Sequence, residues 1–174
     1  MKEIKLTQGY VAMVDDEDFE RVNQHKWFAH ISRRRSDGSI LNVYAEHNIR
    51  VEGGQKTYSM QRFILNITDQ KTEVDHKDGN GLNNRRKNLR KATHEQNQHN
   101  AKLRQDNTTG VKGVNWNRGK LASRIQIGNK RIFLGYFDNL LDATKAYDKA
   151  AKKYHREFAR INLKEDSCHL FPNN

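Results

Sequence analysis

Carboxylate, imidazole and amide side chains crowd into one stretch of this 174-residue chain. The run Val74-Asp75-His76-Lys77-Asp78-Gly79-Asn80 is followed by Asn83-Asn84, Asn88-Leu89-Arg90 and Asn97. Hydrolysis of a phosphodiester needs a base that activates water and a divalent cation that stabilises the developing charge. Oxygen ligands such as Asp75 and the Asn97 amide suit Mg²⁺ or Mn²⁺ and disfavour zinc. The stretch therefore predicts a metal-dependent hydrolytic site.

A calcium-binding loop is the nearest alternative, because Asp78 and Gly79 lie in an acidic turn. The alternating acids and the terminal glutamate of an EF-hand are missing, which argues against that interpretation. His94 and His99 would face different sides of a helix, so we expect surface groups or phosphate contacts rather than metal ligands. The remaining asparagines are expected to shape the loop; they are Asn80, Asn83 and Asn84.

The elements that must position these groups are a strand pair bearing Asp75 and His76 and a helix over residues 93–102. Thr93 is the expected N-cap of that helix, and Gln96 completes a capping box. Further upstream, the hydrophobic pattern predicts a small scaffold of short elements. We expect strands at 10–14, 26–32 and 40–51, turns at 36–39 and 52–55, and a short helix within 58–67. Residues 15–18, beginning with Asp15, are expected to cap another short helix.

The rest of the chain has a cleaner pattern. It predicts strands at 111–116, 121–127 and 130–137, a two-residue turn at Gly128-Asn129, and an amphipathic helix within 139–157. The predicted fold class is α+β: a small antiparallel-sheet N-terminal region with a beta-beta-alpha metal motif, then a three-stranded antiparallel sheet with one helix. The expected domains are 1–104 with the motif at about 72–102, a linker at 105–108, a second domain at 109–163 and a tail at 164–174.

Net charge indicates the partner. Lys and Arg total 32 against 21 Asp and Glu, which gives +11. A surplus of this size suggests a polyanion. The mean hydropathy is −1.04, and no apolar run is long enough to span a bilayer. The first residues do not resemble a signal peptide, so we expect an intracellular, soluble protein with no membrane partner. The single cysteine, Cys168, excludes an internal disulfide and a Cys-rich zinc site.

Several separated segments agree in type and spacing with one family: VDHKDGN at 74–80, NN at 83–84, NLR at 88–90 and THEQNQHN at 93–100. Through them the chain resembles the zinc-free homing-endonuclease branch of the HNH nucleases. The resemblance implies that Asp75 and Asn97 are metal ligands, His76 is the general base and Asn88 braces the loop. Where relatives usually carry His-Arg, this chain has Gln61-Arg62, which we expect to weaken activity if that His binds phosphate.

Residues 109–163 contain the blocks KGV at 112–114, LGYF at 134–137, AYDKAA at 146–151 and ARINL at 159–163. They resemble the plant Apetala-two/ethylene-response-factor family, in which the exposed sheet face enters the DNA major groove. Alternation independently puts Arg124 and Gln126 on the face opposite Ile125, and puts Arg131, Phe133 and Gly135 together. The groove-facing set that the resemblance implies is Lys112, Asn115, Asn117, Arg124, Gln126, Arg131, Phe133 and Tyr136. Several of these depart from the plant residues, so a different DNA site is expected.

These features together predict a site-specific, homing-type DNA endonuclease. The C-terminal sheet would anchor double-stranded DNA, and the N-terminal part would cut it with Mg²⁺ or Mn²⁺, without zinc. We expect a monomer that nicks one strand inside a bacterial or phage-infected cell; double-strand cleavage would need dimerisation or sequential cuts. The alternative is a DNA-binding regulator with a degenerate nuclease motif. RNA binding is a third interpretation, disfavoured by the few exposed aromatic residues available to stack on bases.

Overall fold

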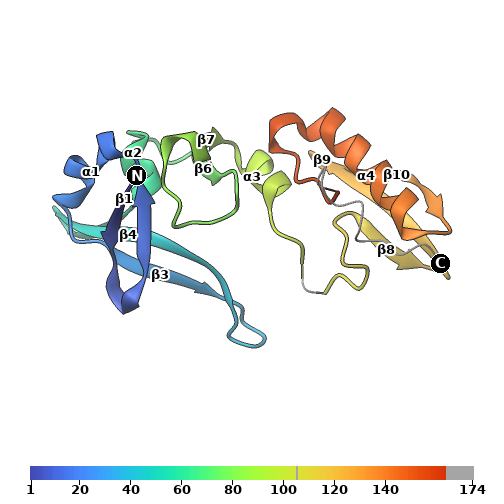
Figure 1. Ribbon diagram of the computed structural model, residues 1–174, viewed down its shortest axis with the longest axis horizontal. Helices are drawn as coiled ribbons and strands as arrows, with labels where there is room; N and C mark the ends of the chain where they lie inside the picture. Colours follow the sequence, from blue (N-terminus) through green and yellow to red (C-terminus); the bar gives the residue numbers. More distant parts are fainter. Residues whose placement is uncertain (105, 164–174) are drawn as a thin grey trace. The chain divides into compact units, whose positions relative to one another are not determined.

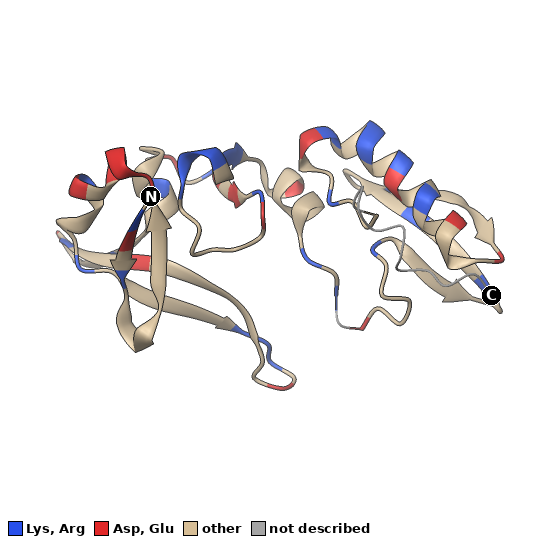
Figure 2. Ribbon diagram, viewed as in Figure 1, with Lys and Arg blue, Asp and Glu red and all other residues tan. Residues whose placement is uncertain are grey.

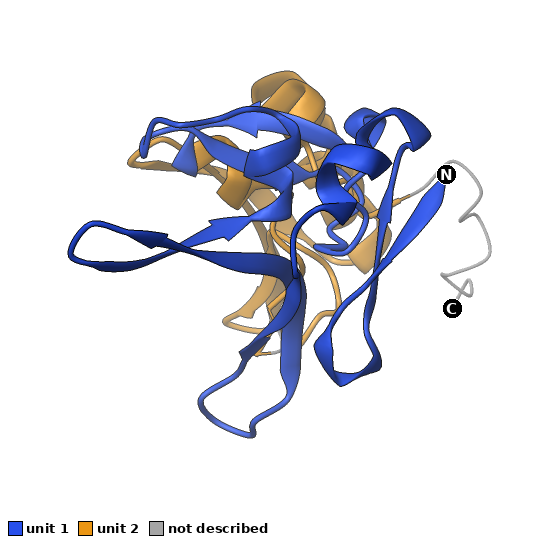
Figure 3. Cartoon of the chain, turned by 90° about the vertical axis from the view of Figure 1, so that its left-hand side faces the viewer, with its two compact units in different colours: residues 1–94 blue, residues 95–174 orange. Residues whose placement is uncertain are grey.

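The computed structural model describes residues 1–104 and 106–163. The chain divides into two compact units, an N-terminal unit of residues 1–94 and a C-terminal unit of residues 95–174 (Figure 3). Residues 95–104, which we expected to belong with the first domain, lie in the second unit. Cys168 and the tail fall outside the described residues.

The N-terminal unit contains small antiparallel sheets (Figure 1). Strand β1 (Lys2–Lys5) pairs with β2 (Val11–Val14), and η1 (Thr7–Gly9) lies between them. A three-stranded sheet has the order β3 (Phe28–Arg33), β4 (Ile40–Val51) and β5 (Gly54–Ser59). Strand β6 (Glu73–His76) pairs with β7 (Leu89–Ala92) across a loop that ends in η2 (Arg86–Asn88). The helices are α1 (Asp16–Asn23) and α2 (Met60–Ile64).

One hydrophobic core holds these pieces together. Val14, Val22, Met60 and Ile64 are buried in it, with Trp27 packed alongside. The Trp27 indole N–H donates to the Val22 carbonyl at 2.8 Å, so this large ring is buried without an unpaired polar group. Helices α1 and α2 each contribute an apolar side to this core, which is the reason for their three-four spacing of apolar residues.

Helix α1 begins as expected after Asp15, but not for the expected reason. Asp15 makes no side-chain cap on α1; its carboxylate accepts the backbone N–H of Arg86 at 2.8 Å. The Arg86 guanidinium in turn binds the buried Asp18 carboxylate at 2.7 and 2.8 Å. Burial alone would raise the pKa of Asp18, yet Arg86 and Arg21 lower it below its usual value. These contacts join α1 to the segment that ends the β6–β7 loop.

The C-terminal unit is a three-stranded antiparallel sheet of order β10 (Lys130–Phe137), β9 (Lys120–Ile127) and β8 (Val114–Asn117). Helix α4 (Leu140–His155) packs on one sheet face, where Ile125 and Tyr147 are buried together with the alanines of the helix. The Asn139 side chain accepts the Asp142 backbone N–H and caps the helix. The outer side of α4 is basic (Figure 2), through exposed Lys145, Lys149, Lys152 and Lys153. Helix α3 (His94–Asn100) and η3 (Arg156–Phe158) complete the described elements.

Over residues 1–104 and 106–163, the fold is thus a mixture of small antiparallel sheets and four α-helices, as the coarse fold class predicted. Several boundaries differ from those expected, and two of them have a clear cause. Strand β8 begins only at Val114, because Gly113 has φ +80° and turns the chain just before it. Helix α2 begins only at Met60, because Tyr58 and Ser59 still pair with β4. Among residues 1–104 and 106–163, no helix combines the length and apolar character of a membrane crossing.

Candidate functional site

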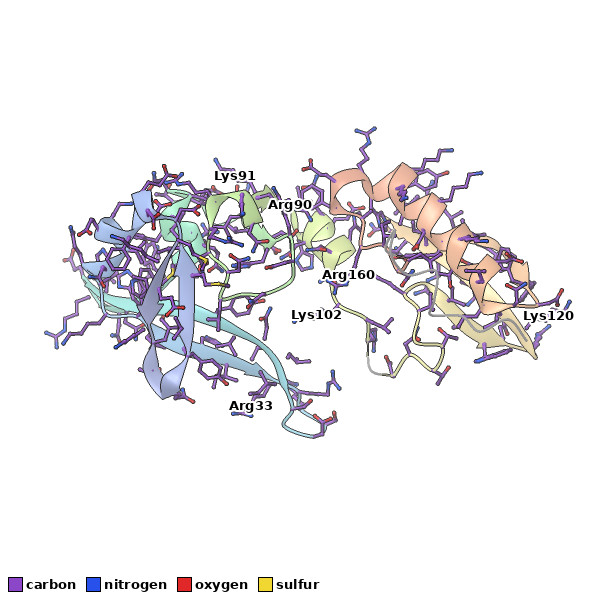
Figure 4. All side chains as sticks on the ribbon, in the orientation of Figure 1. Arg33, Arg90, Lys91, Lys102, Lys120 and Arg160 are labelled. Carbon is purple, nitrogen blue, oxygen red and sulfur yellow. The ribbon has the colours of Figure 1, made fainter. Side chains whose placement is uncertain are left out.

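The first predicted ligand, Asp75, lies in the β6–β7 strand pair. It is directly opposite Arg90 in the register, and both side chains lie on the same side of the ribbon. Arg90 donates to one carboxylate oxygen, Oδ2, from Nε at 2.7 Å and from Nη2 at 2.5 Å. Asp75 is buried, and this charge-assisted contact fixes the orientation of its carboxylate. Figure 4 labels Arg90 near this strand pair.

His76 follows as the last residue of β6 and is only 5% exposed. Its Nε2 is 3.3 Å from Oδ1 of the fully buried Asn84, whose Nδ2 donates to the Gly81 carbonyl. Because an amide oxygen can only accept, Nε2 donates and the neutral ring keeps its lone pair on Nδ1. Burial lowers the pKa of His76, although the Asn84 hydrogen bond and the charge of Asp78 act in the opposite direction. The lowered pKa favours the neutral imidazole, the form that a general base requires.

Asn88 joins the two sides of the loop between β6 and β7. Its Nδ2 donates to the Asn83 carbonyl at 2.7 Å and to the Asp78 carboxylate at 3.0 Å, while its Oδ1 accepts the Asp78 backbone N–H. Its backbone carbonyl accepts the N–H of Lys77. Burial alone would raise the pKa of Asp78, yet hydrogen bonds from Asn80, Asn83 and Asn88 lower it. Polar side chains therefore hold a loop that has little apolar surface to bury.

The same loop packs against strand β4. A Cβ added to Gly81 would lie 2.5 Å from the Val43 carbonyl oxygen and 2.6 Å from the Tyr44 ring, so only glycine fits there. The Gly81 backbone N–H donates to Asn42 Oδ1 at 3.2 Å. The Tyr44 ring lies 6.0 Å from the His76 ring, measured between centroids. Strand β4 thus supports the loop and one side of the imidazole.

Asn97, the second predicted metal ligand, is half-buried on α3 and belongs to the C-terminal unit, whereas Asp75 belongs to the N-terminal unit. His94, the first residue of α3, has an exposed side chain that binds Glu73 at 2.8 Å, in agreement with the expected surface position.

One carboxylate cluster was not anticipated from the sequence. Among residues 1–104 and 106–163, the ligand atoms of Asp15, Glu17 and Asp18 lie within 4.8 Å of one another. Arg86 binds both Glu17 and Asp18, and Arg21 also binds Asp18. Because guanidinium groups already neutralise these carboxylates, the cluster is explained as an ion-pair network of the scaffold.

The Gln61-Arg62 pair lies on α2. Arg62 donates to the carbonyls of Thr72 and Asp69, so it shapes the segment that leads into β6. The Gln61 side-chain oxygen is buried and has no hydrogen-bond partner. The family resemblance implies His at this position, and Gln61 places there a buried oxygen that accepts no hydrogen bond.

The predicted DNA-contacting residues share one face of the C-terminal sheet, with one exception. In the register, Asn115 and Tyr136 both pair with Ala122, Phe133 pairs with Arg124, and Arg131 pairs with Gln126. Antiparallel partners lie on the same face. A bulge between Phe133 and Gly135 shifts the alternation, so Tyr136 and not Gly135 joins Phe133 on this face. The sheet face opposite α4 therefore carries Asn115, Asn117, Arg124, Gln126, Arg131, Phe133 and Tyr136.

This face is open and carries aromatic rings beside its cations. Phe133 and Tyr136 are each 50% exposed, and their rings meet edge to face at 4.9 Å. The Arg124 guanidinium lies 5.8 Å from the Phe133 ring, and Asn117 donates to the Tyr136 hydroxyl at 3.0 Å. These contacts hold aromatic, cationic and amide groups together on one open face of the sheet.

Lys112 is the exception. Its Nζ donates to the backbone carbonyls of His99 and Ala101, at 2.7 and 2.8 Å. Burial lowers the pKa of Lys112 to about 8, with a further contribution from Arg160. Lys112 is therefore not one of the proposed DNA contacts.

The expected surface position of His99 is also wrong. Its ring stacks on that of His155 with centroids 3.6 Å apart and planes 8° from parallel. The sequence offered no signal for this pair, because the two histidines are far apart in the chain and no motif contains both of them. The stack fixes α3 within the C-terminal unit.

Comparison with known proteins defines the class. Residues 68–99, which contain the strand pair, the loop and α3 as far as His99, match the model of an HNH endonuclease family. Protein 3.8 of Escherichia phage T7 is 32% identical over 91 residues, which are 51% of this chain and 74% of the T7 protein. The chain therefore belongs to the HNH endonuclease family, and this indicates a nuclease role and DNA binding. No solved structure matches the chain. Since the family match ends at residue 99, the ethylene-response-factor resemblance stays a prediction.

Proposed function

We propose that the protein is a metal-dependent, site-specific DNA endonuclease of the homing type. The observation that carries the proposal is the buried His76 that directly follows Asp75, whose carboxylate Arg90 orients, on a strand pair within the matched HNH segment. The phage relative supports action inside an infected bacterial cell.

In the proposed reaction His76 takes a proton from the attacking water at Nδ1, because Nε2 is turned toward Asn84. Arg90 holds the Asp75 carboxylate, and Asn88 keeps the loop below His76 in one conformation. The donor set, a carboxylate from Asp75 and an amide oxygen from Asn97, fits a hard cation such as Mg²⁺ or Mn²⁺. That cation would stabilise the charge that develops on the leaving 3′ oxygen.

Replacing the second proposed ligand tests the metal requirement. Asn97→Ala is expected to lower the cleavage of supercoiled plasmid by about 10-fold or more in Mg²⁺ or Mn²⁺, because an amide oxygen ligand is lost. The measurement is the rate of plasmid nicking by the full chain. A reaction that contains EDTA gives the background rate without metal. Gln98→Ala, an exposed change in the same helix, is the matched control. Cleavage by wild type in EDTA, or an Asn97→Ala rate equal to wild type, would contradict the proposed metal role.

We further propose that the sheet face opposite α4 selects the DNA site. Arg131 is an exposed member of the proposed contact set and is paired with Gln126 near the β9–β10 turn. Arg131→Ala is expected to weaken binding of the selected site by about 1–3 kcal/mol. The measurement is the dissociation constant across a salt series. A guanine contact would relax the sequence preference, whereas a phosphate contact would weaken all sequences and reduce the salt slope.

The control for that experiment is Lys145→Ala, which removes one positive charge from α4, on the other side of the sheet. Equal loss in both variants would show that net charge, and not this face, accounts for binding.

A second function is favoured by one observation, the unpartnered side-chain oxygen of Gln61 where relatives usually carry His. If the wild type binds DNA tightly but cuts no plasmid with any metal, the protein is a DNA-binding regulator with a degenerate nuclease motif. Recovery of nicking in Gln61→His would then identify the lost group.

A further inference from the structure

The C-terminal unit contains more than the DNA-facing sheet. Helix α3 belongs to it from Glu95 onward, although α3 lies within the segment that matches the HNH family. The same helix carries Asn97. The contacts between α3 and the sheet therefore also determine the position of Asn97.

Two cationic side chains bind the carbonyl end of α3. Lys112 Nζ donates to the carbonyls of His99 and Ala101, and the Arg160 guanidinium donates to the Asn100 carbonyl at 3.4 Å (Arg160 is labelled in Figure 4). The last carbonyls of a helix have no partner within the helix, and cations are favoured there by the helix dipole. Lys112 and Arg160 thus complete the hydrogen bonding of this end.

The sides of α3 are also held. The Glu95 carboxylate accepts the backbone N–H of Gly128, in the β9–β10 turn, at 2.5 Å. The His99 ring stacks on His155, whose Nε2 bonds the Gln126 carbonyl at 2.8 Å. These contacts join α3 to the sheet turn and to the end of α4.

Lys112 itself is rigidly placed. Its backbone N–H donates to Asn162 Oδ1 at 2.8 Å, and its carbonyl accepts from Asn162 Nδ2 at 3.2 Å. Asn162 is held in turn by the buried Asp148 carboxylate of α4, through its own N–H and its amide group. The chain of contacts runs from α4 through Asn162 and Lys112 to the end of α3.

We propose that Lys112 is a positioning residue for the nuclease reaction, which fixes α3, and with it Asn97, to the DNA-reading sheet of the same unit. The proposal rests on the proposed nuclease function. It assigns the C-terminal unit two tasks, selection of the DNA site and presentation of a metal ligand, and it makes the position of the ligand depend on the sheet that holds the DNA.

The test is Lys112→Met in the full chain, which keeps the stem but removes the three N–H donors. We expect the Mg²⁺ concentration for half-maximal cleavage to rise about 10-fold, as it does when groups that orient metal ligands are lost. DNA binding in EDTA should be unchanged. Lys112→Arg should recover part of the Mg²⁺ dependence, and Lys149→Met, an exposed lysine on α4, should behave as wild type.

Unchanged Mg²⁺ dependence in Lys112→Met would overturn the proposal. So would a loss of DNA binding in EDTA that accounts for the loss of cleavage, since Lys112 would then be a DNA contact. Hydrogen exchange separates this outcome from failure of the nuclease function itself. If the wild type does not cut DNA, faster exchange of the amides of residues 98–101 in Lys112→Met supports the fastening of α3, and unchanged exchange overturns it.

Discussion

His76→Ala is expected to lower DNA cleavage by about 10²–10⁴-fold, the usual contribution of a general base, while DNA binding persists. The reason is that the imidazole is buried, its Nε2 is engaged by Asn84, and burial lowers its pKa, which favours the neutral form that can accept a proton. The measurement compares the single-turnover cleavage rate and the dissociation constant of the full chain on the same DNA.

The matched control is His94→Ala, because His94 lies in the same matched segment but has an exposed side chain paired with Glu73. Its cleavage rate should stay close to that of wild type. Removal of the His76 ring also removes the hydrogen bond to Asn84 Oδ1. His76→Gln, whose amide can donate to the same oxygen, therefore tests whether the loss of activity is purely structural. Wild-type cleavage by either His76 variant would exclude the imidazole as the base; loss of DNA binding in both would make its role structural.

Local features of the fold could be predicted from the sequence, whereas contacts between distant segments could not. The Gly128-Asn129 turn and the sheet face around Arg131 follow from local pattern, and the structure contains both, except that a bulge replaces Gly135 by Tyr136 on that face. The strand pair at Asp75, expected from the grouping of the candidate site residues, is also present. Turn residues and period-two alternation depend only on neighbouring residues, and they can therefore be recognised in a single sequence. The expected roles of these residues in catalysis and DNA contact remain predictions.

Contacts between distant segments could not be read in this way. Asp15 precedes a helix and so looked like its cap, but its carboxylate binds the Arg86 backbone, far along the chain. Lys112 lies beside residues of a sheet face, yet its ammonium group reaches the end of α3. In both cases the side chain can satisfy more than one kind of partner, and only the tertiary fold decides which. The stack of His99 on His155 is a third contact of this type.

Gly113→Ala is expected to destabilise the C-terminal unit by about 2–4 kcal/mol, through strain at a positive φ and overpacking. Gly113 has φ +80°, and a Cβ there would lie 1.9 Å from the Tyr147 ring and 2.9 Å from the Arg124 carbonyl oxygen. The ring has no free space into which it could move, because Tyr147 of α4 is buried against the sheet. The Gly113 carbonyl also accepts the Arg124 backbone N–H at 2.8 Å, so a shifted Gly113 would disturb the start of β8 and the adjoining Lys112.

Thermal unfolding of the full chain, followed by calorimetry, measures this effect. Gly119→Ala is the matched control, because Gly119 has nearly the same φ, +78°, but nothing within 4 Å of an added Cβ. The control should carry only the cost of the backbone conformation, about 1 kcal/mol. The excess in Gly113→Ala then measures the close approach of Tyr147. Equal destabilisation of both variants would mean that the Tyr147 ring yields freely, and that Gly113 is required for its backbone conformation and not for packing.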